Sequence, residues 1–177
     1  FINTSASEFG ATFYGEQQVI YSSARTDIYR SSSSWTGKAN NQLFIANISA
    51  NGYLESPVFL KGNETNAYNE GPLSFSPDGK KVAFTKNNFV DGTRQLPATG
   101  LELSIYTADI STNGNWTNEA SFPYNGSGYS TGYPAFSPDG NAIYFASDRP
   151  DGFGGFDIYV SYKSADSWSA PQNLGPV

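Results

Sequence analysis

The peptide Phe-Ser-Pro-Asp-Gly occurs twice in this chain, in "SFSPDGKKVAFTKN" (residues 74–87) and in "AFSPDGNAIYFASDR" (residues 135–149). Proline presets φ, aspartate bonds nearby backbone and glycine permits a positive φ, so each copy predicts a tight chain reversal. The alternating apolar residues after each turn predict a β-strand. A unit that recurs after 61 residues, from Phe75 to Phe136, indicates a structural module rather than a catalytic site.

Weaker copies extend this repeat over the whole chain. The segment "ATFYGEQQVIYSSAR" (11–25) aligns with both turn-containing segments, so that Phe13, Phe75 and Phe136 take equivalent places. A second set comprises "QLFIANI" (42–48), "SIYTADI" (104–110) and "DIYVSYK" (157–163). A third set, opened by an aromatic residue, comprises "YLESPVFL" (53–60), "WTNEASF" (116–122) and "WSAPQNL" (168–174).

Each repeat therefore predicts four short antiparallel strands, which is typical of a β-propeller blade. We expect an all-β chain with one partial propeller domain over residues 1–177. Its three four-stranded antiparallel blades span about residues 1–66, 67–128 and 129–177. The side chains expected to fill the space between blades are Phe75, Phe136, Trp116 and Trp168.

The composition excludes several classes of function. The 177 residues carry a formal net charge of −6 with only 10 scattered Lys and Arg, so nucleic acid is not an expected partner. The apolar runs are far shorter than the roughly 20 residues that cross a bilayer, so no direct membrane insertion is expected. Histidine and cysteine are absent, which excludes Ser-His-Asp and Cys-His catalysis and histidine-based zinc sites.

The repeat resembles those of TolB-type propellers, in which Pro-Asp-Gly closes the first hairpin of each blade. The stretch "IYFASDRPDGFGGFDIYVS" (143–161), followed by "WSAPQNLGPV" (168–177), is similar to periplasmic proteins of Bacteroidetes. That resemblance implies a propeller beside tetratricopeptide repeats and a C-terminal OmpA-like peptidoglycan-binding domain, and for some members a place in the type IX secretion and gliding apparatus. The earlier repeats depart from the pattern, with "FYGEQQ" in place of "FSPDGK" and "FTKNN" in place of "FASDR".

The number of blades raises a question of closure. Closed propellers usually have 4–8 blades, whereas the sequence predicts three. The expected explanation is that the chain is a piece of a larger propeller. The alternative is that two copies meet and close a six-bladed ring. An open stack of three blades would expose apolar faces at both ends.

Five residues are candidates for ligand or partner binding. Glu8 and Glu70 each stand five residues before an anchoring phenylalanine, near the expected mouth of the channel. They could bind a cation or an amine-bearing ligand, or accept hydrogen bonds from loop backbone. Trp35, in a serine-rich loop, is either a binding anchor or a cover for the blade edge. Tyr129 and Tyr133 either stack on a sugar or cover the top of the core.

Arg25 and Arg149 take the same place in two repeats, which indicates a structural clamp. We expect Arg149 to pair with Asp157 or Asp148 and so to tie the second strand of its blade to the third. The Asp- and Gly-rich stretch 148–157 makes calcium an alternative, because hard cations bind several oxygens on a flexible backbone. Its spacing does not fit an EF-hand, and we expect no metal and no cofactor.

The resemblance implies a non-catalytic protein–protein interaction module of a periplasmic or outer-membrane-associated protein, either OmpA-like or part of type IX secretion. Its partners would be other envelope proteins, and peptidoglycan would be bound only through a domain outside this chain. The alternative is a glycan-binding or glycan-cleaving propeller, since glycosidases need only paired carboxylates. That alternative requires Glu8 and Glu70 to face each other across an open concavity, with Tyr129 or Tyr133 beside them.

Overall fold

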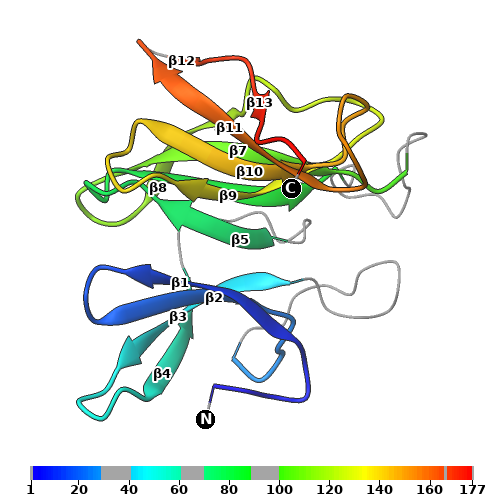
Figure 1. Cartoon of the computed structure of the whole chain (residues 1–177). Helices are drawn as coiled ribbons and strands as arrows, with labels where there is room; N and C mark the ends of the chain where they lie inside the picture. The colour runs from blue at the N-terminus through cyan, green and yellow to red at the C-terminus, as the bar shows by residue number, and fades with distance from the viewer. Residues whose placement is uncertain (1, 29–40, 61–69, 89–99, 166, 177) are drawn as a thin grey trace.

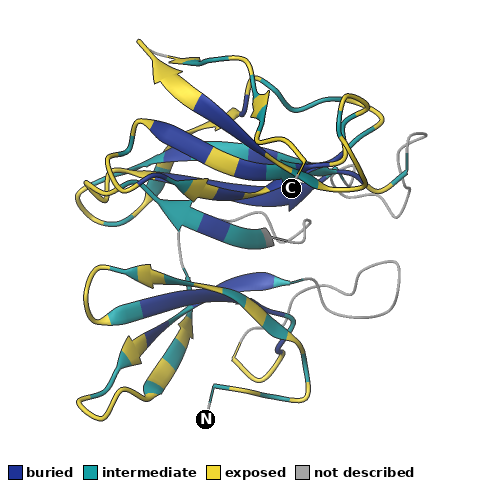
Figure 2. Cartoon of the chain, in the orientation of Figure 1, coloured by how far each residue is buried: buried dark blue, intermediate teal, exposed yellow. Residues whose placement is uncertain are grey.

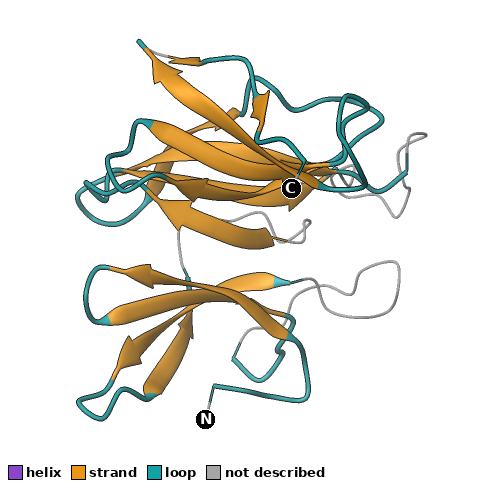
Figure 3. Ribbon diagram, in the orientation of Figure 1, coloured by secondary structure: helices purple, strands orange, loops and turns teal. Residues whose placement is uncertain are grey.

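The computed structural model describes residues 2–28, 41–60, 70–88, 100–165 and 167–176. Over these residues the chain forms thirteen strands in three antiparallel sheets and no helix (Figures 1 and 3). The expected all-β architecture of propeller blades is therefore confirmed. The described residues contain no helix that is long and apolar enough to cross a membrane.

Each sheet is one blade, and its strands pair in chain order. Blade 1 contains β1 (Glu8–Tyr14), β2 (Gln18–Ser23), β3 (Gln42–Ile48) and β4 (Leu54–Phe59). Blade 2 contains β5 (Glu70–Phe75), β6 (Lys81–Asn87), β7 (Leu103–Ile110) and β8 (Trp116–Ser121). Blade 3 contains β9 (Thr131–Phe136), β10 (Ala142–Ser147), β11 (Asp157–Ser164), β12 (Ser167–Trp168) and β13 (Gln172–Asn173). The outermost strand of blade 3 is split, because β12 and β13 both pair with β11.

The repeated Ser-Pro-Asp-Gly segments form the tight turns that the sequence predicts. In blade 3 the amide of Gly140, which has a φ of +71°, donates to the carbonyl of Ser137 over 2.9 Å. The Ser137 hydroxyl donates to Asp139 Oδ1, which also accepts the amide of Asn141. These hydrogen bonds to the charged carboxylate, that from Ser137 first, lower the pKa of Asp139 to about 2. The turn aspartates therefore serve the local fold, as expected.

The strand pairing confirms most of the repeat alignment and corrects one part of it. Phe13, Phe75 and Phe136 lie opposite Val19, Val82 and Ile143, so the three anchoring phenylalanines are equivalent. In the outermost strands, Trp116 lies opposite Ile110 and Trp168 opposite Lys163. The residue that takes this place in blade 1 is Leu54, opposite Ile48, and not the neighbouring Tyr53. The third aligned set is therefore wrong by one residue in the first repeat.

Two of the three apolar clusters lie between the blades (Figure 2), and the third, around Tyr21 and Phe44, belongs to blade 1 alone. Between blades 1 and 2 the fully or nearly fully buried residues are Ile20, Leu43, Leu73, Val82, Phe84 and Ala108. Between blades 2 and 3 they are Ala83, Ile105, Phe122, Ile143, Phe145 and Tyr159. The expected space-filling aromatic residues, Phe75, Trp116, Phe136 and Trp168, are partly buried against these two clusters.

Candidate functional site

Most of the candidate residues gather at one end of the blades. At this end β1, β5 and β9 begin and β2, β6 and β10 finish, since Glu8 pairs with Ser23, Glu70 with Lys86 and Thr131 with Ser147. We call it the loop end, because the connections between the second and third strands leave from it. The opposite end carries the Pro-Asp-Gly turns, and we call it the turn end.

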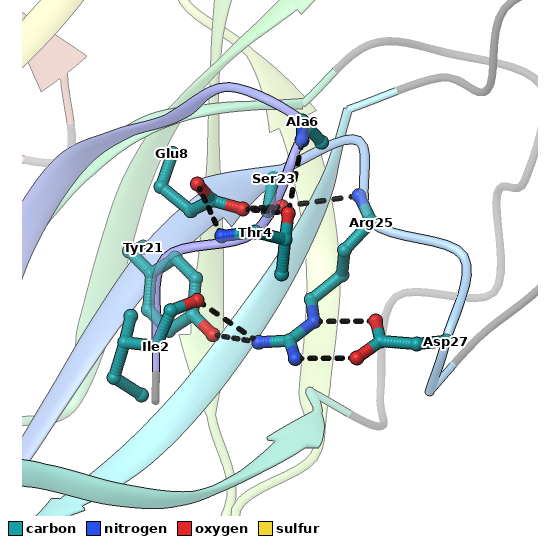
Figure 4. A network of polar contacts seen from close by, with 8 residues as sticks. All are labelled: Ile2, Thr4, Ala6, Glu8, Tyr21, Ser23, Arg25 and Asp27. Atoms are coloured by element: carbon teal, nitrogen blue, oxygen red, sulfur yellow. Dashed lines mark hydrogen bonds and ion pairs between the residues drawn. The ribbon is translucent and has the colours of Figure 1, made fainter.

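Glu8 is held by the segment that leads into its own strand (Figure 4). Its carboxylate accepts the amide of Thr4 over 3.2 Å, the hydroxyl of Thr4 over 2.7 Å and the hydroxyl of Ser23 over 2.9 Å. Partial burial raises the pKa of Glu8, but these hydrogen bonds outweigh it and keep that pKa below its ordinary value. The carboxylate is thus a charged acceptor that fastens the N-terminal segment to β2.

Arg25 lies buried at the loop end of blade 1 (Figure 4). It donates to both carboxylate oxygens of Asp27 over 2.8 Å, to the hydroxyl of Tyr21 over 3.0 Å and to the carbonyl of Ile2 over 3.4 Å. Its guanidinium also lies 5.7 Å from the centre of the Phe44 ring. The hydrogen bonds from Arg25 lower the pKa of Asp27 to about 2. The planar guanidinium of Arg25 therefore connects β2, the core aromatic residues and the N-terminal segment.

Arg149 takes the equivalent place in blade 3, but its partners differ from the expected ones. It forms no ion pair with Asp157 or Asp148 within the part of the chain that the structure describes. It donates instead to the carbonyl of Tyr124 over 3.2 Å and to the hydroxyl of Ser147 over 3.2 Å. Its guanidinium lies over three aromatic rings, those of Tyr129, Phe145 and Tyr159, at 4.7 to 5.6 Å. The expected Arg149–Asp157 pair is wrong, because the aromatic faces attract the cation.

Blade 2 has no arginine at this place, and a lysine that the sequence reasoning missed supplies the cation. Lys86 Nζ lies 5.1 Å from the centres of both the Phe84 and Tyr106 rings. It also donates to both carboxylate oxygens of Glu119, over 2.7 and 2.9 Å. In each blade, therefore, a cation contacts the aromatic residues that pair between the second and third strands. It is buried in blades 1 and 2 and half-buried in blade 3. The signal that could have revealed it is a lysine two residues after the strand's core aromatic.

Asp157 is bonded within the glycine-rich loop of blade 3. Its Oδ2 accepts the amide of Phe153 and the side-chain amide of Asn173, the latter over 3.0 Å. A Cβ on Gly152 would lie 2.5 Å from Asp157 Oδ2, so a larger residue there would displace this carboxylate. Asp157 thus ties the loop to β13 and not to Arg149. Among the described residues no three acidic or histidine side chains gather as a metal site would require.

The two candidate tyrosines make separate contacts. Tyr129 is half-buried between Arg149 and Gly126, where its ring fills the space that a Cβ on Gly126 would need. Tyr133 is half-exposed on β9 and meets the Phe156 ring edge-on at 6.4 Å. Trp35 and the side chain of Glu70 lie outside the described residues. The convergence of Glu8 and Glu70 therefore stays a prediction.

A polar network joins blades 2 and 3 at the loop end. Ser130 is its centre: its amide donates to Asp148 over 2.6 Å, and its carbonyl accepts the Ser147 hydroxyl over 2.7 Å. Its own hydroxyl accepts the amide of Leu103 from the neighbouring blade over 3.1 Å. Beside it, the buried carboxylate of Glu102 accepts the amide of Gly128 over 2.8 Å. These bonds make the described part of the loop end a firmly connected platform.

Grooves lie between the blades at the turn end. One of about 640 Å³ runs between blades 2 and 3, and its lining includes Asp78, Asp139, Asn141, Lys163 and Trp168. A second of about 680 Å³ lies between blades 1 and 2, beside Tyr14, Glu16, Gln18 and Gly79.

The structure resembles those of known proteins, whereas the sequence does not. No protein-family model and no curated protein matches the sequence. TolB from Acinetobacter baumannii has a similar structure, with a TM-score of 0.53 and 15% identity over 91% of this chain and 30% of that one. A puromycin hydrolase is similar with a TM-score of 0.54 and 17% identity, over 97% of this chain and 23% of that one.

The chain has a TolB-like β-propeller fold. It spans less than a third of the length of either protein to which we compare it above. One of these two proteins is named as a hydrolase, so this fold occurs in enzymes as well. Whether this chain takes part in catalysis must therefore be argued from its side chains and not from its fold.

Proposed function

We propose that the TolB-like blades form a non-catalytic docking module that binds another protein of the bacterial cell envelope. One observation carries the proposal: five charged side chains described at the loop end are engaged within the fold. Glu8, Arg25, Lys86, Arg149 and Asp157 all bind neighbouring strands, loops or rings. A catalytic acid or base must reach substrate, whereas side chains of this kind build a stiff frame.

The turn-end grooves support the same proposal. Both are open and lie on hairpins, and the groove between blades 2 and 3 mixes carboxylates, lysine and aromatic surface. A partner that inserts a segment here needs little rearrangement of the module, which limits the entropic cost of binding. The resemblance to Bacteroidetes envelope proteins leads us to propose a periplasmic location, in an OmpA-like or type IX secretion protein.

Site-specific photo-crosslinking in the host cell tests this proposal. A crosslinker at Asn141 or Lys163, in the groove, is expected to capture one defined envelope protein. The matched control places the crosslinker at Glu55, an exposed position on β4 of the first blade, and is expected to capture none. Equal capture from all three positions would contradict the proposal. Saturable binding of an oligosaccharide that Glu8→Gln abolishes would instead support the glycan alternative.

A further inference from the structure

The sequence contains three Asn-Gly dipeptides, at residues 51–52, 113–114 and 125–126. Asparagine is most open to deamidation when glycine follows it, because glycine has no Cβ to shield its backbone nitrogen. The reaction requires the side-chain carbonyl carbon of the asparagine to reach that nitrogen, so the side chain and the backbone must both be able to rotate. The hydrogen bonds around each asparagine therefore decide how readily it reacts in the folded chain.

Two of the dipeptides lie in equivalent hairpin turns at the turn end. Residues 49–52 join β3 to β4, residues 111–114 join β7 to β8, and both have the sequence Ser-x-Asn-Gly. In each turn the glycine amide donates to the serine carbonyl, over 2.9 Å at Gly52 and 2.8 Å at Gly114. The first turn is exposed, as Figure 2 shows. Asn113 is exposed as well, although its blade has a neighbour on either side, so packing between blades leaves these turns open.

The asparagines of these two turns are held differently. Asn113 Oδ1 accepts the hydroxyl of Ser111 and, over 3.4 Å, the backbone amide two residues further on. Asn51 makes no side-chain hydrogen bond in the part of the chain that the structure describes, and the Ser49 hydroxyl accepts the amide of Tyr53 over 3.1 Å. The Asn51 side chain is therefore free to turn toward the nitrogen of the following glycine.

The third dipeptide is held most firmly. Asn125 Oδ1 accepts the amide of Ile105 over 2.9 Å. Its Nδ2 donates to the carbonyl of Ile105 over 2.7 Å and to the hydroxyl of Ser121 over 3.0 Å. The Tyr129 ring also fills the space beside Gly126. A rotation that brings the Asn125 side chain to the glycine nitrogen must break all three of these side-chain bonds.

We propose that Asn51 is a site of spontaneous deamidation in the folded protein. The backbone nitrogen of Gly52 attacks Cγ of Asn51, and its proton passes through water to the leaving nitrogen. The bond from Cγ to Nδ2 breaks, ammonia leaves and a five-membered succinimide remains. Water then opens this ring, so that either aspartate or isoaspartate stands at position 51, and no atom changes its oxidation state. The proposal is independent of the docking function, since it depends only on the turn itself.

The repeat itself indicates that one of the two products fits this turn. The Pro-Asp-Gly turns have the same pattern of serine, any residue, an aspartate or asparagine, and glycine, with aspartate in the place of Asn51. In blade 3 that aspartate, Asp139, accepts the hydroxyl of Ser137 and the amide of Asn141. Aspartate at position 51 can be held in the same way. Isoaspartate lengthens the backbone by one carbon and displaces the hydrogen bond that closes the turn.

Peptide mass spectrometry of the folded chain, sampled during incubation at mildly alkaline pH, measures the rate at each of the three asparagines. Asn51 has to break only the hydrogen bond from its glycine, whereas Asn113 and Asn125 each have to break two more bonds. Asn51 is therefore expected to react about 10-fold faster than either. Ser111→Ala removes one bond to Asn113 and should raise the rate there several-fold, while the rate at Asn51 stays unchanged.

The same chain unfolded in urea is the control for the sequence around each asparagine. Without the fold, the three dipeptides should react at closely similar rates. Equal rates at Asn51 and Asn125 in the folded chain would overturn the proposal. So would the folded-state ranking if it persisted in urea, or a rate at Asn113 that Ser111→Ala leaves unchanged. Circular dichroism confirms that Ser111→Ala remains folded, and the Asn51→Asp variant supplies the chromatographic standard that tells aspartate from isoaspartate.

Discussion

Replacing Gly71 with alanine tests how closely blades 1 and 2 approach at the start of β5. Gly71 has a φ of +92°, and a Cβ there would overlap Ser22 and lie 3.3 Å from Leu43 Cδ2. A positive φ costs a residue with a Cβ about 1–2 kcal/mol. An extra methyl group in a filled interface costs roughly 1–3 kcal/mol more. We therefore expect Gly71→Ala to lower the free energy of unfolding by about 2–5 kcal/mol.

Gly114→Ala is the matched control for the backbone part of this loss. Gly114 has a φ of +81°, and no heavy atom lies within 4 Å of the place that its Cβ would take. Its substitution is expected to cost only the conformational part, about 1–2 kcal/mol. Urea denaturation followed by tryptophan fluorescence and by circular dichroism gives both values, provided that the two probes coincide and the slope is unchanged.

A second substitution locates the remaining loss. Ser22→Ala removes the hydroxyl that the new methyl group would overlap, so in the Gly71→Ala background it should recover about 1–2 kcal/mol. The cycle includes Ser22→Ala alone, because the serine makes other contacts. If Gly71→Ala costs no more than Gly114→Ala, or if the double variant recovers nothing, the close contact between these blades is refuted.

Other predictions concern charge. Lys86→Ala should lower the free energy of unfolding by about 1–4 kcal/mol in chemical denaturation, because it removes a buried cation from two rings and leaves Glu119 unpaired. Lys81→Ala is the control: it breaks an ion pair that is about half exposed, and should lower the free energy of unfolding by under about 0.5 kcal/mol. Asp139→Asn should destabilise the chain at neutral pH, and the difference from wild type should shrink as the pH falls below 4 toward 2, since the carboxylate contributes only while ionised. A difference that stays constant over that pH range would contradict the role of the ionised turn aspartate.

The parts of the fold that depend on neighbouring residues could be read from the sequence. Pro-Asp-Gly determines its own turn through φ preferences and one side-chain hydrogen bond, so the hairpins at Ser76 and Ser137 follow from local chemistry. The alignment of the third set of segments is wrong in blade 1, where Leu54 and not Tyr53 lies at the position that tryptophan takes in the other blades. Aromatic character is a weak guide to register, which the pairing of whole strands decides.

The contacts of Arg149 could not be read from the sequence for a different reason. Its aromatic partners Phe145 and Tyr159 come from two strands, and its hydrogen-bond acceptor, the Tyr124 carbonyl, comes from the segment that enters the blade. The sequence alone predicts an ion pair for Arg149, because the aspartates close to it in the chain are the only partners that the sequence indicates. In the folded blade Asp148 bonds Ser130 and Asp157 bonds Phe153, and neither carboxylate pairs with the arginine.

A cation occupies the same site at the loop end of each blade, although it comes from different positions of the repeat. Lys86 lies two residues after Phe84 in the same strand, and alternate residues of a strand project from one face, so its side chain reaches the rings directly. Arg149 lies just beyond the end of β10 and reaches equivalent rings from the loop. A lysine of the strand and an arginine of the loop thus bring a cation to the same site, which indicates that the blade requires the cation itself. Each cation has ring faces and a hydrogen-bond acceptor beside it. In blades 1 and 3 the acceptors, Asp27 and the Tyr124 carbonyl, lie outside the strands, so there the cation couples the position of the connecting segments to the packing of the core.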